Sequence, residues 1–304
     1  MTIPKLLLLS GLPCSGKSTM AQKLAEEYDA NIHSSDAIRE ELTGDINNQE
    51  NNKLVFETLH SRVKDDLRNG KSCIYDACCV HYKERKAFVQ ELKNIPCEKI
   101  CVLMATPYEV CVERSMRRDR NVPEYVIKRM YTSFDVPYWY EGWDDIRIVY
   151  SDGAEGSYGG VADWVESVMD YDQHNSHHAL TLGEHCLKTF EHLNSMPVPF
   201  WEIRTAALVH DCGKVKTATY WDRRGECSDE CHYYDHHYCG SYDSLFFRDV
   251  DDHLYVAQLI RWHMQPYFWE KDGSQKHHNK FRKLWGETLY SDIMRLHEAD
   301  VAAH

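Results

Sequence analysis

Short apolar runs alternate with amphipathic segments over the first half of the chain. Two segments, GKSTMAQKLAEEY (16–28) and ERKAFVQELKN (84–94), have apolar residues three and four positions apart, which is typical of helices. The apolar runs are KLLLLSG (5–11), NIHSSD (31–36), SCIYDA (72–77), KICVLMAT (99–106) and RIVYSDG (147–153). Strands that alternate with helices in this way predict a parallel sheet flanked by helices.

From about Val161 the pattern becomes helical, and no strand pattern alternates with it. The helical segments are VADWVESVMDY (161–171), HALTLGEHCLKTFEHL (178–193), FWEIRTAALVHDC (200–212), VDDHLYVAQLIRWHM (250–264) and SDIMRLHEADVAAH (291–304). A loop rich in glycine and serine, GAEGSYGG (153–160), precedes them. We therefore expect an α/β domain over residues 1–155 and an all-α domain over residues 156–304.

The first apolar run is too short to span a bilayer, and it leads straight into a glycine-rich turn. This argues against a signal peptide or membrane anchor. The twelve cysteines then indicate reduced thiols and a cytoplasmic protein with no membrane partner.

The net charge of −13 is unevenly distributed. Residues 1–152 carry 21 basic and 24 acidic side chains, whereas residues 153–304 carry 14 and 24. Three of the eighteen histidines precede residue 82, and fifteen follow residue 173. An acidic protein is a poor non-specific nucleic-acid binder, so a nucleic-acid substrate would have to be held locally, at its end.

GLPCSGKS (11–18) matches the G-x-x-x-x-G-K-[ST] motif between a predicted strand and a predicted helix. Its backbone N–H groups and the helix N-terminus favour phosphate. Lys17 is expected at the β- and γ-phosphates and Ser18 at Mg²⁺. The sequence therefore predicts binding of ATP or another nucleoside triphosphate with Mg²⁺, through Gly11, Cys14, Ser15, Gly16, Lys17, Ser18 and Thr19.

Asp36, in SSDAIRE (34–40), follows the second predicted strand, where open α/β sheets place their ligands. Asp36 could accept the proton of an attacking hydroxyl, and Arg39 could hold a nearby phosphate. The alternative is that Asp36 caps the following helix. Arginines cluster downstream at positions 114, 117, 118 and 120, either as a lid over the transferring phosphoryl group or as a solvated helix face.

Together with CIYDA (73–77), these motifs resemble the 5′-polynucleotide kinase branch of P-loop phosphotransferases over residues 1 to about 150. The resemblance implies Asp36 as general base, Arg39 at the acceptor phosphate, and catalytic roles for Lys17, Arg118 and Arg120. Arg118 would also contact the nucleotide, and Asp76 the acceptor side. The family often continues with Thr-Asn after that aspartate, whereas Ala77, Cys78 and Cys79 stand here.

ALVHDCGK (207–214) places a histidine and an aspartate side by side. An isolated His–Asp dipeptide is usually only a hydrogen-bonded pair. Here further histidines and an aspartate lie on either side of it, in the order H…HD…H…H…D. This order resembles the HD phosphohydrolase superfamily over residues 172–304. The resemblance implies one divalent metal held by His185, His210, Asp211 and Asp300, and a second held by His236 and His263 with Asp211 bridging.

Mixed imidazole and carboxylate ligands suit Mn, Fe, Co, Ni or Zn, and two such ions would activate water and clamp a phosphoester. Asp211 and Lys214 are expected to be catalytic, and Lys214 and His178 to hold the substrate phosphate. His237 is the alternative to its neighbour His236. Lesser interpretations are a zinc site at Cys227 and Cys231, a solvated loop at His277–His278, and core positions for Trp262, Trp269 and Trp285.

A kinase and a phosphohydrolase on one chain make sense if they act on the two sides of a broken strand. The sequence therefore predicts a bifunctional enzyme that heals nucleic-acid ends, RNA rather than DNA, before a separate ligase acts. It would phosphorylate a 5′-hydroxyl and remove a 3′-phosphate or a 2′,3′-cyclic phosphate. The alternatives are a small-molecule or nucleoside kinase fused to an HD nucleotidase, and an ATP-dependent regulator whose HD domain senses nucleotide.

Overall fold

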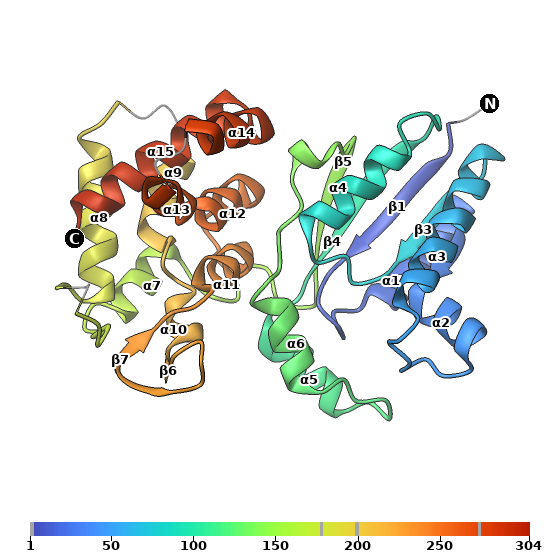
Figure 1. Ribbon diagram of the computed structural model, residues 1–304, viewed down its shortest axis with the longest axis horizontal. Coiled ribbons are helices and arrows are strands. Elements are labelled where there is room, and N and C mark those ends of the chain that lie inside the picture. The colour runs from blue at the N-terminus through green and yellow to red at the C-terminus, as the bar shows by residue number, and fades with distance from the viewer. Residues whose placement is uncertain (1–2, 177–178, 198–200, 273–274) are drawn as a thin grey trace. The chain divides into compact units, whose positions relative to one another are not determined.

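The computed structural model describes residues 3–176, 179–197, 201–272 and 275–304. It divides into two units (Figure 1). The N-terminal unit consists of the residues up to Met130 with Pro137–Ser151, and the C-terminal unit of Tyr131–Val136 with the described residues from Asp152 onward. Within the described ranges, no helix has the length and apolar character needed to cross a membrane.

The N-terminal unit is built on a parallel five-stranded sheet in the order β2-β3-β1-β4-β5. The strands are β1 (Lys5–Ser10), β2 (Asn31–Ser34), β3 (Cys73–Asp76), β4 (Glu98–Ala105) and β5 (Asp145–Tyr150). Leu6 to Leu9 of the central strand are all buried, because helices cover both faces of a parallel sheet. The predicted α/β fold is confirmed, and a glycine-containing loop connects β1 to the next helix.

The helices of this unit are α1 (Lys17–Tyr28), α2 (Ser35–Thr43), α3 (Asn52–Arg68), α4 (Tyr82–Glu91), α5 (Tyr108–Met116), α6 (Glu124–Tyr131) and the 3₁₀ turn η1 (Trp139–Glu141). Helix α3 was not predicted, although its buried residues Val55, Leu59, Val63 and Leu67 recur every four positions. The carboxyl ends of β1, β2 and β3 lie at one edge of the sheet, so the loops that follow them meet there.

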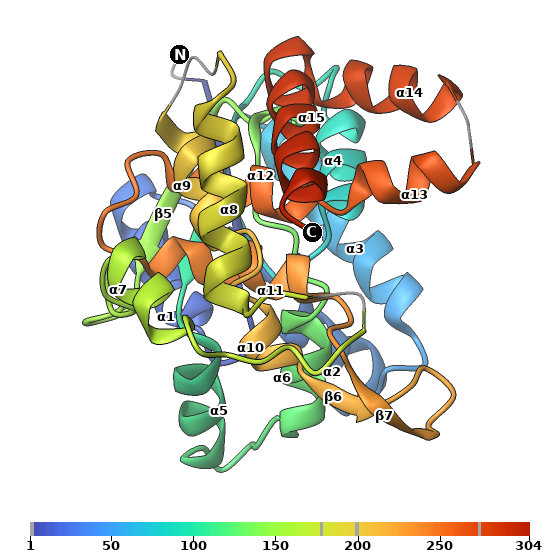
Figure 2. The same ribbon diagram turned by 90° about the vertical axis from the view of Figure 1, so that its left-hand side faces the viewer.

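The C-terminal unit is largely helical, as predicted. Its helices are α7 (Val161–Ser167), α8 (Leu182–Asn194), α9 (Trp201–Val209), α10 (Lys214–Thr217), α11 (His236–Asp243), η2 (Ser244–Phe246), α12 (His253–Trp262), α13 (Gln265–Asp272), α14 (Gln275–Trp285) and α15 (Glu287–Ala302). Helix α8 lies beside α9 and α15, and α11 beside α12 (Figure 2).

Three features of this unit differ from the sequence prediction. An antiparallel hairpin, β6 (Thr219–Trp221) and β7 (Cys227–His232), interrupts the helices. Its strands are short and bury only Cys231, so they have no apolar alternation by which to recognise them. The loop prediction for His277–His278 was wrong, because both lie in α14 and His278 Nδ1 is 2.8 Å from Tyr290 Oη.

The third difference is the segment Tyr131–Val136, which packs in the C-terminal unit although the predicted boundary placed it in the first domain. Tyr131 Oη donates to Asp243 Oδ2 at 2.7 Å, and Arg261 Nε donates to Asp135 Oδ1 at 2.7 Å. The three tryptophans Trp262, Trp269 and Trp285 are buried, which confirms their core positions.

Candidate functional site

The loop between β1 and α1 curls tightly around the start of α1. Cys14 (φ 64°) and Gly16 (φ 97°) both adopt left-handed backbone conformations, which turn the chain back on itself. A Cβ on Gly11 would lie 2.7 Å from Ser15 Oγ and 2.9 Å from Met104 Cβ. Glycine is therefore required at position 11 for the loop to close against β4.

Lys17 and Ser18 follow directly at the start of α1. The Lys17 ammonium is buried and donates to the carbonyls of Gly11 (3.0 Å) and Leu12 (2.7 Å). Ser18 Oγ donates to Asp76 Oδ2 at 3.2 Å. Burial raises the pKa of Asp76, and the Lys17 charge and the Ser18 hydrogen bond partly oppose that rise. Hydroxyl and carboxylate oxygens are the ligands that Mg²⁺ prefers, so this pair fits a Mg²⁺–nucleotide complex.

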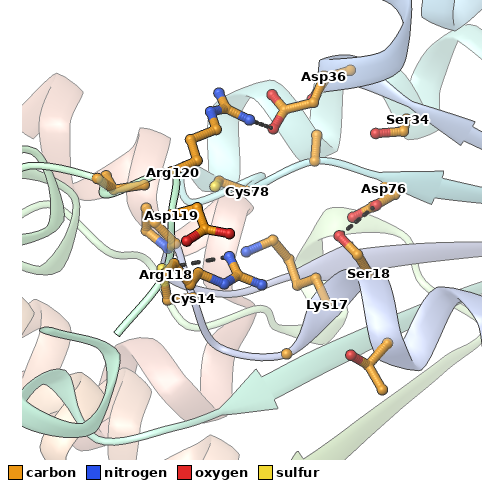
Figure 3. Close-up of a pocket in the computed structure, with 16 residues that line it drawn as sticks. Cys14, Lys17, Ser18, Ser34, Asp36, Asp76, Cys78, Arg118, Asp119 and Arg120 are labelled. Carbon is orange, nitrogen blue, oxygen red and sulfur yellow. Dashed lines mark hydrogen bonds and ion pairs between the residues drawn. The ribbon is translucent and has the colours of Figure 1, made fainter. Parts of the chain in front are cut away.

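These residues line a cavity of about 400 Å³ (Figure 3). In that figure Lys17 and Arg118 point into the same space, and Arg120 reaches toward Asp36. The predicted site residues that line the cavity are Cys14, Gly16, Lys17, Ser18, Thr19, Asp36, Asp76, Arg118 and Arg120. Ser34, Ser35, Cys78, Asp119 and Val122 also line it and were not predicted. For Asp119, the only signal in the sequence was its position between Arg118 and Arg120.

Asp36 is held by an arginine on each of its carboxylate oxygens. Arg39 Nη1 donates to Oδ1 at 3.0 Å, and Arg120 Nη1 donates to Oδ2 at 2.9 Å. Arg39 is buried behind Asp36 and is steadied by Asn52, whose Oδ1 accepts from Arg39 Nη2 at 2.9 Å. The capping interpretation of Asp36 was wrong, because Ser34 is the N-cap and Asp36 lies in the first turn of α2.

The clustered arginines are divided between a helix and the loop after it. Arg118 and Arg120 lie in the loop between α5 and α6, where Arg118 Nη1 contacts Cys14 Sγ at 3.7 Å and Arg120 Nε donates to Asn47 Oδ1 at 3.2 Å. Arg117 forms an exposed ion pair with Glu113 and does not line the cavity. The solvated-face interpretation therefore fits Arg117 but not Arg118 or Arg120.

In the C-terminal unit, the six histidines and aspartates of the predicted metal site come together. They are His185 on α8, His210 and Asp211 after α9, His236 at the start of α11, His263 at the end of α12, and Asp300 on α15. All six are buried. Asp211 Oδ2 lies 3.5 Å from His185 Nε2 and 3.4 Å from His210 Nε2. Its other oxygen, Oδ1, lies 3.2 Å from His236 Nε2 and 3.7 Å from His263 Nε2.

Three of these histidines share one backbone arrangement. Nδ1 of each lies close to the carbonyl oxygen three residues earlier: His210 to Ala207 (2.9 Å), His236 to Tyr233 (2.8 Å) and His263 to Ile260 (2.7 Å). A carbonyl can only accept, so each Nδ1 carries a proton and each Nε2 is the nitrogen left to bind a metal.

His236 Nε2 and His263 Nε2 face each other at 3.3 Å. Burial, and after it the neighbouring His210 and His236, lower the pKa of His263 to about 3, so that His263 is neutral. With its proton on Nδ1, the neutral His263 presents the lone pair of Nε2 to this space. This arrangement of nitrogen and carboxylate donors therefore fits divalent transition-metal ions.

The carboxylates of the cluster are ionised. Burial by itself would raise the pKa of Asp211, but the Lys214 ammonium and the His210 imidazole hold it well below its usual range. Lys214 Nζ lies 2.7 Å from Asp211 Oδ2 and donates to Gln173 Oε1 at 2.8 Å. His178, predicted to hold the substrate phosphate with Lys214, lies outside the described residues.

Residues that were not predicted complete the surroundings of the cluster. Tyr267 Oη donates to Asp300 Oδ2 at 3.1 Å, Gln173 contacts Lys214, and His304 approaches Asp300. His237 is in none of the metal-ligand groups found among the described residues, whereas His236 is in one. Neither the exposed Cys227 nor the buried Cys231 is in these groups.

Comparison with known proteins gives partial matches. Residues 6–137 match the sequence model of the family described as "AAA domain". The L-seryl-tRNA(Sec) kinase of Methanococcus maripaludis is 28% identical over 150 residues, which cover 47% of this chain. The chain spans 58% of the length of that relative.

Two solved structures are similar in part. One is a gluconokinase from Sinorhizobium meliloti (15% identity, TM-score 0.36, covering 49% of this chain and 84% of that one). The other is a chain of the Pnkp1/Rnl/Hen1 RNA repair complex (22% identity, TM-score 0.37, covering 44% of each chain). Taken with the loop geometry, the family match identifies residues 6–137 as a P-loop domain.

Proposed function

We propose that this chain is a bifunctional end-healing enzyme whose substrate is nucleic acid, in the first place RNA. The N-terminal unit transfers the γ-phosphate of ATP to a 5′-hydroxyl end, and the C-terminal unit hydrolyses a 3′-phosphate or a 2′,3′-cyclic phosphate. The observation that carries the kinase half is the position of Asp36. It lies in the same cavity as Lys17 and Ser18 and is held by two arginines.

In the kinase reaction, the acceptor hydroxyl attacks the γ-phosphorus in line as the bond to the β,γ-bridging oxygen breaks and ADP leaves. Asp36 accepts the hydroxyl proton. The buried Arg39 fixes the position of Asp36, while the more exposed Arg120 can turn from Asp36 to the transferring phosphoryl group. Lys17 and Arg118 then neutralise charge on the phosphates as it develops.

In the C-terminal unit, one or two divalent ions would be held by Asp211, Asp300 and the four histidines His185, His210, His236 and His263. The ions supply Lewis acidity and an activated water at neutral pH. Asp211 would serve both positions, because its oxygens face different pairs of histidines. Lys214 balances the charge of Asp211 and lies where it can bind a substrate phosphate.

The similarity to an L-seryl-tRNA(Sec) kinase supports phosphoryl transfer to a hydroxyl carried on RNA. One observation favours a second candidate, a kinase for a small molecule joined to an HD nucleotidase. The net charge of −13 disfavours long contacts with a polyanion. The third candidate, an ATP-dependent regulator, has no need of an aspartate held at the acceptor side of the phosphate pocket.

The two activities can be tested together with γ-labelled ATP and a 5′-hydroxyl RNA oligonucleotide that ends in a 3′-phosphate. Asp36→Asn should lower 5′ labelling by about 10²- to 10⁴-fold and leave 3′ processing unchanged. Asp211→Asn should abolish 3′ processing and leave 5′ labelling unchanged. Glu40→Gln on α2 and Asp229→Asn on the hairpin, both exposed, are the matched controls.

The kinase role and the metal-binding role can each be excluded by a separate result. Labelling of nucleosides but of no oligonucleotide by the wild-type protein would exclude the polynucleotide substrate. Full 5′ labelling by Asp36→Asn would remove the general-base role. Transition-metal content of the purified proteins, measured by mass spectrometry, tests the other unit independently of activity. Equal metal in Asp211→Asn and wild type would contradict the ligand assignment.

A further inference from the structure

His304 lies one helical turn beyond Asp300. Helix α15 ends at Ala302, but the turn continues, because Ala303 N donates to Asp300 O at 3.1 Å and His304 N donates to Val301 O at 3.4 Å. Residues four apart lie on the same face of a helix. The imidazole of His304 is therefore directed to the side of α15 that carries the Asp300 carboxylate.

The two oxygens of Asp300 have different surroundings. Oδ2 accepts from Tyr267 Oη at 3.1 Å, which orients the carboxylate. Oδ1 faces Nε2 of three histidines: His185 at 3.0 Å, His210 at 3.6 Å and His304 at 3.8 Å. Three imidazoles thus converge on one carboxylate oxygen.

The distance between the His304 and His185 rings is similar to the distances between the histidines already assigned to the metals. The ring centroids of His304 and His185 are 4.8 Å apart. The ring centroids of His185 and His210 are 5.1 Å apart, and those of His236 and His263 are 5.3 Å apart. Two donors each about 2.1 Å from one ion lie roughly 3.0 to 3.4 Å apart. The separations of 3.0 to 3.8 Å around Asp300 Oδ1 are within a few tenths of an ångström of that range.

We propose that His304 is a further ligand of the metal ion held by His185 and Asp300. The inference rests on the metal-binding role proposed for the C-terminal unit and adds a ligand that the sequence order did not include. The ion would have three imidazole nitrogens and two carboxylate oxygens as donors, which favours a transition metal over Mg²⁺ or Ca²⁺.

His304 differs from the other ligands in its exposure. Its side chain is 34% exposed, whereas those of His185 and Asp300 are 2% and 5% exposed. His304 therefore forms the solvent-facing edge of the cluster. A ligand at that edge controls how many positions of the ion remain open to water, and its loss should change both the affinity for the ion and its coordination.

The test uses Co²⁺ added to the metal-free full chain, with wild type, His304→Ala and His192→Ala compared. His192 is an exposed histidine on α8, the helix that carries His185, and is the matched control. Affinity is measured by competition with a chelator, and coordination by the visible absorption of bound Co²⁺. For His304→Ala we expect at least about a tenfold rise in the Kd of one ion, by comparison with the loss of an outer partner of a ligand, together with an altered spectrum.

The outcomes separate this inference from the function on which it rests. If the wild-type protein binds no Co²⁺, the metal-binding role of the C-terminal unit fails. If wild type binds Co²⁺ and His304→Ala binds it with the same affinity and the same spectrum, the role of His304 is overturned. A structural role alone would leave the Co²⁺ spectrum unchanged, and His192→Ala should leave both the affinity and the spectrum unchanged.

Discussion

At the scale of single residues, Asp211 unites the histidine cluster because its two oxygens face different partners. Oδ2 is directed to His185 and His210, and Oδ1 to His236 and His263. Within each of these two pairs, the histidines come from segments that are more than 20 positions apart in the sequence. The position of α11 relative to the His210–Asp211 turn therefore determines whether the second group forms.

Gly213 allows that close approach. A Cβ at position 213 would lie 2.0 Å from His236 O and 2.6 Å from Gly240 N. Gly213→Ala should force α11 away from Asp211, lower the free energy of unfolding by more than about 3 kcal/mol, and remove the metal held through His236 and His263. Chemical denaturation and metal stoichiometry measure both effects.

Gly240 is the matched position. A Cβ there would lie 3.1 Å from Gly213 N and 3.2 Å from Cys212 Sγ, contacts that small shifts can relieve. Gly240→Ala should cost about 1 to 3 kcal/mol and keep both metal groups. A Gly213→Ala protein that is as stable as wild type and holds as much metal would show that this contact does not set the position of α11.

Sequence reasoning found residues in contiguous motifs and missed residues that only folding brings near. Gly11 to Ser18 could be predicted because one short segment makes the whole loop. Gln173 and Tyr267 could not, since each reaches the cluster through a residue 41 or 33 positions away. His304 could have been predicted from the sequence, because its spacing of four from Asp300 places both residues on one face of a helix.

At the scale of elements, a buried ion pair joins α4 to the turn η1. Arg85 donates through Nη2 to Glu141 Oε1 at 2.7 Å and through Nε to Oε2 at 2.8 Å, and both side chains are fully buried. Trp143 Nε1 also donates to Glu141 Oε2 at 2.9 Å. The carboxylate thus joins α4 to the turn η1 and the residue Trp143 just after it.

Glu141→Gln would leave the Arg85 guanidinium buried without a counter-charge. Removing one partner of a buried pair costs about 3 to 5 kcal/mol, and we expect a loss of this size in denaturant unfolding of the N-terminal unit. Glu57→Gln is the control, because the exposed Lys53–Glu57 pair, 3.8 Å apart, should contribute less than about 1 kcal/mol. Similar losses for the two variants would contradict the structural role of the buried pair.

Elements were predictable where burial imposes a pattern. The strands of the sheet read as continuous apolar runs because helices cover both faces. Helix α3 carries a regular apolar stripe and could have been recognised, whereas the strands of the hairpin β6–β7 bury only Cys231 and have no such pattern. Helix α14 buries only Phe281 and Trp285, too little to distinguish its polar sequence from a loop.

At the scale of the whole molecule, long-range contacts limit what a sequence can reveal. The segment Tyr131–Val136 belongs to the C-terminal unit through a buried ion pair between Asp135 and Arg261, 126 positions apart. No local pattern indicates such a pairing. Composition, in contrast, does predict a property of the whole molecule, because a net charge of −13 restricts the surface on which a polyanion can bind.

If the proposed RNA substrate is held only at its end, its affinity should depend weakly on salt. Contacts from two arginines of the loop between α5 and α6 would neutralise about two phosphates, which gives a slope of roughly −1.4 for log kcat/KM against log salt concentration with a single strand. The measurement compares a short and a long 5′-hydroxyl RNA between 50 and 200 mM NaCl at saturating ATP, and both should have the same slope. A slope steeper than about −3, or one that grows with RNA length, would mean that the strand runs along a basic surface, which the acidic composition argues against.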